Sequence, residues 1–143
     1  MYRAIVIALL LMINGQALAH SLEPSYRVIR FHQGFSRFPM EAVNAYSHSQ
    51  VYEVEVFEDD SFSTQLVFNA SPNEIYLQPG GRREFTIEMD EVDLDDFLVC
   101  THAQLDGARS RVCSRVLVCR PEHSTAECKR RVSKRRGEYV FGR

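Results

Sequence analysis

Polar and apolar residues alternate along much of the chain. In Val51–Glu58, the apolar residues Tyr52, Val54 and Val56 fall on one face and glutamates fall on the other. The same alternation runs through Arg83–Met89. A period of two is typical of β-strands with one buried and one solvated face, and such strands form antiparallel sheets. No segment of helical length has a clear period of 3.6, so the pattern predicts an all-β fold.

Further segments rich in β-branched and aromatic residues bring the prediction to seven or eight short strands. Turn signals separate them, among them Pro79-Gly80-Gly81, which precedes the strand around Phe85. Seven or eight short strands with regular turns are typical of an antiparallel β-sandwich. The other candidate strands are Tyr26–Phe31, Met40–Tyr46, Thr64–Phe68, Ile75–Leu77, Phe97–Gln104 and Arg109–Cys119.

The dipeptide Asp106-Gly107 lies between two of these strands and is a strong signal for a two-residue hairpin turn. If it forms the loop, counting back along both strands places Cys100 opposite Cys113 in a non-hydrogen-bonded pair. The Cα atoms of such a pair are about 4.5 Å apart, which is within disulfide range. Cys119 and Cys128 remain, so we expect them to form a second disulfide by elimination.

Residues 1–19 have the features of a cleaved secretory signal peptide. Arg3 and the amino terminus supply positive charge before the apolar run Ala4–Ile13. Ala17 and Ala19 match a signal-peptidase site, and the apolar run is too short for a spanning helix. The alternative is an uncleaved N-terminal anchor. We expect a periplasmic or secreted protein whose mature chain begins at His20, in a compartment where paired cysteines form disulfides.

Composition places the chain among ordinary globular proteins. Of its 143 residues, 45% are hydrophobic and 25% are charged, which excludes full-length disorder and a multi-span membrane protein. The net charge of −2 provides no basic field, so we expect no nucleic-acid partner.

The charges are nevertheless segregated along the chain. Glu84–Asp96 contains seven acidic residues and no basic one, whereas Arg109–Arg143 contains eleven basic and three acidic residues. The tail, residues 122–143, includes the basic cluster Lys129–Arg136. This tail is either a solvated chain end or a segment that docks on an acidic partner or an anionic membrane surface.

The sequence lacks the residue patterns of common enzymes. It has no glycine-rich phosphate loop, no G-x-S-x-G and no H-E-x-x-H, and paired cysteines leave no thiol nucleophile. The cysteines also lack the close C-x2–4-C spacing of zinc sites. An N-terminal His20 could chelate copper, but the other histidines are scattered. We therefore expect no enzymatic activity, no cofactor and no metal site.

Three segments share their order and spacing with a known family. The first is Tyr26–Ile29, followed by Gly34 and the strand Tyr52–Glu58. The second is Ser71–Gly80, in which Leu-Gln-Pro-Gly precedes an alternating strand. The third is Val116–Pro121, which ends in Arg-Pro. Together they resemble the N-terminal Ig-like domain of periplasmic pilus chaperones of the chaperone–usher type.

The resemblance implies one Ig-like β-sandwich over residues 20–121 and a set of partner-binding residues. In that family, an arginine on the first strand and a lysine on the last hold the C-terminal carboxylate of a pilus subunit. Arg27 matches the arginine; the lysine's place falls on Val116, with Arg115 as the neighbouring cation. The last strand also lends alternating apolar side chains, here Val112, Val116 and Val118. The alternatives are that Arg27 is a surface charge and that the valines face the core.

Besides lacking the lysine, the sequence departs from the family in two further respects. The residues after Pro121 are too few for the family's second Ig-like domain, and Cys119 replaces an aromatic residue. We expect a protein-binding module that pairs with an extended partner segment by β-strand addition. Its partner would be another protein, such as a pilin-like subunit or an usher. The alternative is a secreted structural or adhesive Ig-like module whose strands are all satisfied internally.

Overall fold

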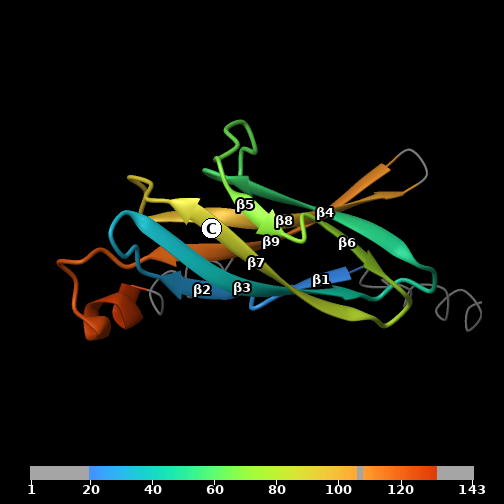
Figure 1. Cartoon of the computed structure of the whole chain (residues 1–143), viewed down its shortest axis with the longest axis horizontal. Helices are drawn as coiled ribbons and strands as arrows, with labels where there is room; N and C mark the ends of the chain where they lie inside the picture. The colour runs from blue at the N-terminus through green and yellow to red at the C-terminus, as the bar shows by residue number, and fades with distance from the viewer. Residues whose placement is uncertain (1–19, 106–107, 132–143) are drawn as a thin grey trace, which may run out of the picture.

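The computed structural model describes residues 20–105 and 108–131, which form two β-sheets packed face to face (Figure 1). One sheet has the strand order β1-β3-β7-β5 and the other has the order β2-β9-β8-β4-β6. The nine strands of these residues are β1 (His20–Glu23), β2 (Tyr26–Ile29), β3 (Phe35–Asn44), β4 (Gln50–Phe57), β5 (Asn69–Ser71), β6 (Glu74–Leu77), β7 (Arg82–Asp90), β8 (Asp96–Leu105) and β9 (Ala108–Val118).

The predicted all-β sandwich is confirmed, with three corrections in detail. The described residues contain nine strands rather than seven or eight, because β1 and β5 are too short to show a period in the sequence. Thr64–Phe68 is a loop that makes one isolated bridge; Leu66 and Phe68 pack on the core without forming a strand, and Val67 is exposed. The pairing is not purely antiparallel, since β2 runs parallel to β9.

The chain changes sheets between its first two strands. β1 pairs with β3, and Glu23 is the last residue of that ladder. Pro24 follows, and because proline has no N–H it cannot extend the ladder. The chain then joins the other sheet as β2, where the carbonyl of Ser25 accepts a hydrogen bond from the N–H of Arg115. This crossing places β1 and β2 on the same side of the sandwich.

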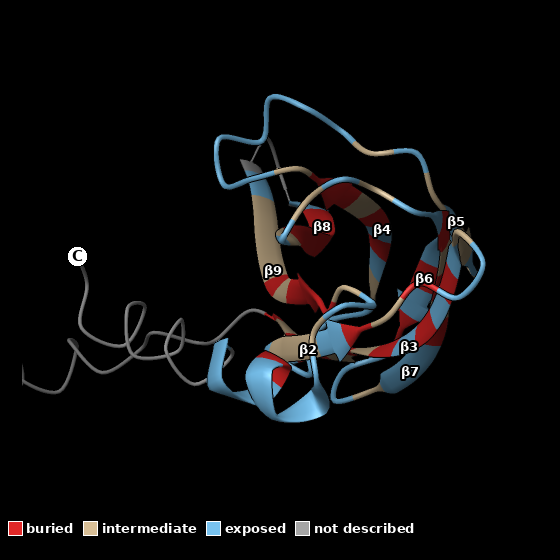
Figure 2. Ribbon diagram, turned by 90° about the vertical axis from the view of Figure 1, so that its left-hand side faces the viewer, coloured by how far each residue is buried: buried red, intermediate tan, exposed pale blue. Residues whose placement is uncertain are grey.

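The core lies between the two sheets and is filled by alternate residues of the long strands (Figure 2). At one end, the buried Asn44 ties several loops together. Its amide nitrogen donates to the carbonyls of His48, Leu77 and Gln78, and its side-chain oxygen accepts from the Tyr52 hydroxyl at 2.8 Å. The largest fully buried side chains are Tyr52, Phe85, Phe97, Met40, Ile75, Ile87, Val56, Val99 and Val116.

Both expected disulfides are present. Cys100 lies opposite Cys113 in the β8–β9 ladder, and their Cα atoms are 4.1 Å apart. Cys119 bonds to Cys128, which lies in a short helix of residues 125–131. Figure 1 shows this helix at one end of the sandwich and the β8–β9 hairpin projecting from the other end.

The described part of the tail, and Arg120 just before it, lie against the acidic segment. Arg120 forms ion pairs with Asp93 at 3.0 Å and Asp95 at 3.4 Å, and Arg131 of the tail lies 4.0 Å from Asp95. Arg30 donates to the carbonyls of Arg120 and His123, and the bond to His123 holds the tail at this end of the sandwich. The predicted signal peptide, the turn Asp106-Gly107 and residues 132–143 lie outside the described residues. Among the described residues, no helix is long and apolar enough to cross a membrane.

Candidate functional site

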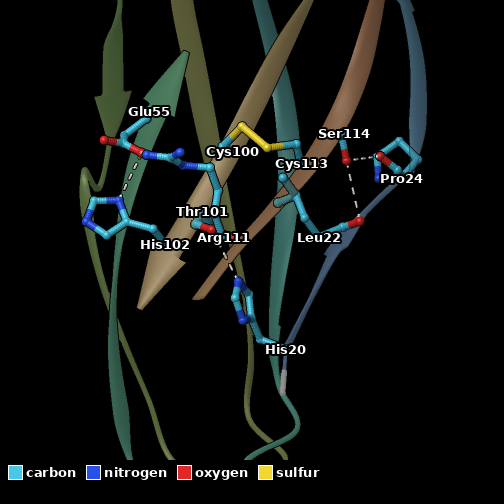
Figure 3. Close-up of a disulfide and its surroundings, with 10 residues drawn as sticks. All are labelled: His20, Leu22, Pro24, Glu55, Cys100, Thr101, His102, Arg111, Cys113 and Ser114. Atoms are coloured by element: carbon cyan, nitrogen blue, oxygen red, sulfur yellow. Dashed lines mark hydrogen bonds and ion pairs between the residues drawn. A yellow bond between two sulfur atoms is a disulfide. The ribbon is translucent and has the colours of Figure 1, made fainter. Parts of the chain in front are cut away.

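The crossing from β1 to β2 leaves half of β9 without a neighbour on one side. β8 pairs with β9 along nearly its whole length, but β2 pairs only with residues 115–118. β1 lies beside the first half of β9, where the Ser114 hydroxyl donates to the carbonyl of Pro24 at 2.6 Å (Figure 3), yet its ladder is with β3. In the described chain, no strand covers residues 109–114 on this side. We call this segment the open half of β9.

Along the open half, every second residue directs its backbone N–H and C=O groups away from β8. The N–H of Arg115 bonds to Ser25 on this side, and the N–H of Val118 bonds to Asp95 on the other side. Because this orientation alternates along an antiparallel ladder, the N–H and C=O groups of Arg109, Arg111 and Cys113 face away from β8. The open half therefore offers the unpaired backbone groups that an added strand requires.

The first half of β3, on the same side of the sandwich, does not offer an equivalent edge. β1 pairs with β3 only over residues 41–44, so residues 35–40 also lack a strand neighbour on that side within the described chain. That segment contains Pro39, which has no N–H to donate. Proline on an edge strand blocks the pairing of another strand, so β9 has the more receptive edge.

Arg27 lies next to the open half, at the opening between the two sheets. Its guanidinium carbon is 6.0 Å from the centre of the Phe38 ring, and it borders a hollow of about 710 Å³ beside the β1–β2 crossing. Burial lowers the pKa of Arg27, and the charge of Glu84 opposes this effect. Within residues 20–105 and 108–131, no hydrogen bond or ion pair engages this guanidinium. It is a partly desolvated cation that an anion could pair with.

The other predicted partner-binding residues are placed differently. Val116 is fully buried and Val118 is 8% exposed, and both belong to the core between the sheets. Val112 is partly buried against the same core. Arg115 lies on the outer face of its sheet, where it forms an ion pair with Asp96 at 3.2 Å. The structure therefore brings Arg27 to the side opening but directs Arg115 away from it.

A second cluster of side chains, which the sequence analysis did not predict, packs on the outer face of β9. The Arg111 guanidinium lies between the rings of Phe57 and Phe62, 4.9 and 4.7 Å from their centres, and donates two hydrogen bonds to Glu55. Phe62 comes from the exposed loop between β4 and β5, which arches over β8 and β9 in Figure 2. The predicted hairpin register is enough to place Arg111 opposite His102. The contact with Phe62 could not be predicted in this way, because Phe62 lies in a loop whose sequence has no periodic pattern.

The Cys100–Cys113 disulfide lies beside this cluster (Figure 3). It packs with Phe57 and Leu98 into a small apolar group on the outer face. Near this apolar group, the ring of His102 lies between two carboxylates. Its Nε2 is 3.2 Å from Oε2 of Glu53, and its Nδ1 is 3.1 Å from Oε2 of Glu55. The disulfide and these contacts hold the open half of β9 against β8 from its outer side, which keeps its edge extended.

His20, considered above as a copper ligand, is the first residue of β1. Its side chain is buried at the end of the core, with the ring 4.9 Å from the ring of Tyr52 and Nε2 3.2 Å from the carbonyl oxygen of Thr101. No group of three or more His, Cys, Asp or Glu side chains in residues 20–105 and 108–131 could hold a metal ion.

Sequence comparison identifies no relative: no protein-family model matches the chain, and no curated protein matches it significantly. Solved structures with a similar fold do exist. The E. coli chaperone DraB is similar with a TM-score of 0.59 at 11% identity, over 71% of this chain and 55% of DraB. A chain in the complex of the Salmonella enterica SafA pilin with the SafB chaperone is similar with a TM-score of 0.58 at 13% identity, over 73% of this chain and 56% of that chain.

These matches confirm the resemblance to chaperone–usher pilus chaperones at the level of the fold. This chain spans about half the length of those chaperones. A C. elegans protein, WR4 of the MSP family, is also similar, with a TM-score of 0.51 at 7% identity over 71% of this chain and 98% of WR4. Since proteins of such different origin share it, the fold by itself does not specify a function.

Proposed function

We propose that this protein is a periplasmic, non-enzymatic binding module that takes up an extended segment of another protein by β-strand addition to the open half of β9. In strand addition, main-chain hydrogen bonds supply affinity and the side-chain contacts of the added strand supply specificity. The single observation that carries the proposal is the run of unpaired backbone groups at Arg109, Arg111 and Cys113.

Arg27 supports the same proposal. It lies where the open half ends, because Arg27 pairs in register with Val116 in the β2–β9 ladder. An unpaired, partly desolvated guanidinium beside an open strand edge suits a partner that carries a carboxylate. A pilin-like subunit or an usher would be such a partner, by analogy with the chaperones whose fold this chain shares. The predicted signal peptide and the disulfides suit the same compartment.

The test blocks the edge without disturbing the fold. Arg109→Pro removes an N–H that faces away from β8, so the β8–β9 ladder keeps its hydrogen bonds. Arg109→Ala is the matched control, since it removes the same side chain but keeps the N–H. Tagged wild-type protein and both variants are used to capture partners from periplasm, and the captured proteins are quantified by mass spectrometry.

We expect Arg109→Pro to lose a partner that both wild type and Arg109→Ala retain. Circular dichroism and thermal unfolding establish that the three proteins are equally folded. Equal capture by all three proteins would contradict strand addition at β9, and the structural or adhesive role would then be the better explanation of the fold.

A further inference from the structure

A second opening lies beyond Arg27 on the same side of the sandwich. It is a groove of about 460 Å³ between β2 and the first half of β3. Its walls include Arg27, Arg30 and Arg37, together with His32. The exposed apolar side chains of Val28 and Phe35, each 43% exposed, lie along the same groove. We call it the arginine groove.

The arginine groove carries a net positive charge. Among the described residues that line it, none is aspartate or glutamate. Among the described residues, no hydrogen bond or ion pair joins Arg27 to a carboxylate, although the charge of Glu84 acts on it, and Arg30 donates to the carbonyl oxygens of Arg120 and His123, so neither guanidinium is held in an ion pair there. Arg37 pairs with Glu88 at 3.2 Å, but the Arg37 side chain is exposed and that of Glu88 is only partly buried, and ion pairs so close to solvent are weak. The groove therefore suits an anionic ligand.

The open half of β9 and the arginine groove follow one another along the side of the sandwich. The open half ends at Ser114, the chain crosses the side at Pro24 and Ser25, and the groove begins at Arg27. A segment paired with the open half meets this crossing. Because β2 occupies the edge of β9 from residue 115 onward, a longer segment has to run along the other edge of β2. Its next residues then lie in the arginine groove, between β2 and β3.

The site is poorly built for a segment that ends at Arg27. A terminal carboxylate is held best where two cations converge on its oxygens. Val116 occupies the position opposite Arg27, and Arg115 is on the other face with Asp96. The remaining cations, Arg30 and Arg37, lie farther along the groove. They are placed for acidic side chains that come after the residue at Arg27.

We propose that the arginine groove binds an internal stretch of an extended partner segment in which acidic side chains alternate with apolar ones. This inference rests on the proposed strand addition and adds the chemistry of the bound segment. Acidic side chains pair with Arg27, Arg30 and Arg37, while alternate apolar side chains contact Val28 and Phe35. The terminal carboxylate of the partner is not required.

The experiment uses the folded protein and three fluorescent peptides of about twelve residues, which at about 3.3 Å per residue span the open half and the groove. One half of every peptide alternates valine with threonine. The other half alternates valine with aspartate in one peptide and valine with asparagine in the other two. The aspartate peptide carries a C-terminal amide; the asparagine peptide is made both as the amide and as the free acid. Binding is measured by fluorescence anisotropy at low and physiological salt.

We expect the amidated aspartate peptide to bind at least about tenfold more tightly than both asparagine peptides, a difference of about 1.4 kcal/mol. The double variant Arg30→Gln, Arg37→Gln should remove that preference. The double variant Arg83→Gln, Arg130→Gln removes the same charge outside the groove and should keep it. Because Arg30 also holds the tail, Arg37→Gln alone is measured as well, and it should reduce the preference while leaving thermal unfolding unchanged.

Three results would overturn the inference. One is equal binding of the aspartate amide and the asparagine free acid, since a terminal carboxylate would then suffice. Another is a preference for aspartate that survives the loss of Arg30 and Arg37. The third is the absence of binding by any peptide. Failure of strand addition itself has a different signature, namely tight binding of the aspartate peptide that Arg109→Pro does not weaken.

Discussion

Arg27 lies directly opposite Val116 in the parallel ladder between β2 and β9. The resemblance to pilus chaperones implies a second cation near this point, and the neighbouring Arg115 is displaced from it by one residue. Because side chains in a strand alternate between faces, that single residue sends Arg115 to the outer face and into its ion pair with Asp96. Arg27 is thus the cation that the β2–β9 ladder contributes to the side opening.

The first prediction concerns Arg27. Arg27→Ala should reduce capture of the partner by about 30-fold or more, since losing one side of a desolvated charge pair costs about 2–5 kcal/mol. The stability of the variant should change by no more than about 0.5 kcal/mol, because no hydrogen bond or ion pair to a described residue is lost and the ring of Phe38 is as far as 6.0 Å away. Arg83→Ala is the control for a lost positive charge elsewhere. A folded Arg27→Ala variant that captures its partner at wild-type affinity would rule out Arg27 as a residue that binds the partner.

The second prediction concerns Val116, which is fully buried between the sheets. Val116→Asp should unfold the protein, or destabilise it by more than about 4 kcal/mol, because it places an unpaired charge in the core. Val67→Asp is the control, since Val67 is 92% exposed and its substitution should change stability by about 0.5 kcal/mol or less. Chemical denaturation followed by circular dichroism measures both. A stable Val116→Asp variant that only loses partner binding would mean that Val116 is accessible in solution.

The third prediction concerns the Cys100–Cys113 disulfide. The variant with both cysteines changed to alanine should lose about 2–4 kcal/mol of stability, because the bond restricts the unfolded chain; the loop it closes, between residues 13 apart in sequence, is short, which keeps the loss in this range. Non-reducing peptide mapping of the wild type should recover Cys100 linked to Cys113 and Cys119 linked to Cys128. Recovery of Cys100 linked to Cys119 or Cys128 would contradict the β8–β9 register.

The fourth prediction concerns the pH dependence of stability. Burial lowers the pKa of His20 below its ordinary value of 6.5, the hydrogen bond with the Thr101 carbonyl opposes this, and the charge of His102 adds to it. The unfolded chain therefore takes up a proton near pH 6.5, while the folded protein does so only at lower pH. The stabilising contribution of neutral His20 is present above pH 6.5 and is lost as the pH falls, by up to about 1.4 kcal/mol per pH unit.

The comparison with His20→Gln isolates this effect. Glutamine can still donate to the Thr101 carbonyl but does not titrate. The other ionisable groups near the ring, namely His102, Tyr46, Tyr52 and the amino terminus that the predicted cleavage creates at residue 20, are present in both proteins. Urea denaturation at pH 7.5, 6.5 and 5.5 should show a steeper loss of stability in the wild type than in His20→Gln. Parallel curves for the two proteins would mean that His20 is as easily protonated when folded as when unfolded.

Local chemistry was enough to predict several elements of this fold. The alternation in Val51–Glu58 and Arg83–Met89 specifies strands with one buried face, and these segments match β4 and β7 to within one residue at each end. The register that a two-residue Asp-Gly turn predicts is the register of the β8–β9 ladder, in which Cys100 pairs with Cys113. These features depend on residues that are close in sequence, so periodicity and turn chemistry determine them.

The tertiary structure decided which edges and charges remain available. β1 is too short to show a period, yet its departure to the other sheet is what leaves residues 109–114 of β9 open. The sequence could not assign Val116 to the core rather than to a partner, because alternation identifies two faces but not what covers each. Arg27 and Arg115 look equivalent as cations in the sequence. Only the packing of β2, β8 and β9 places Arg27 at the opening, without an ion pair to any described residue, and joins Arg115 to Asp96.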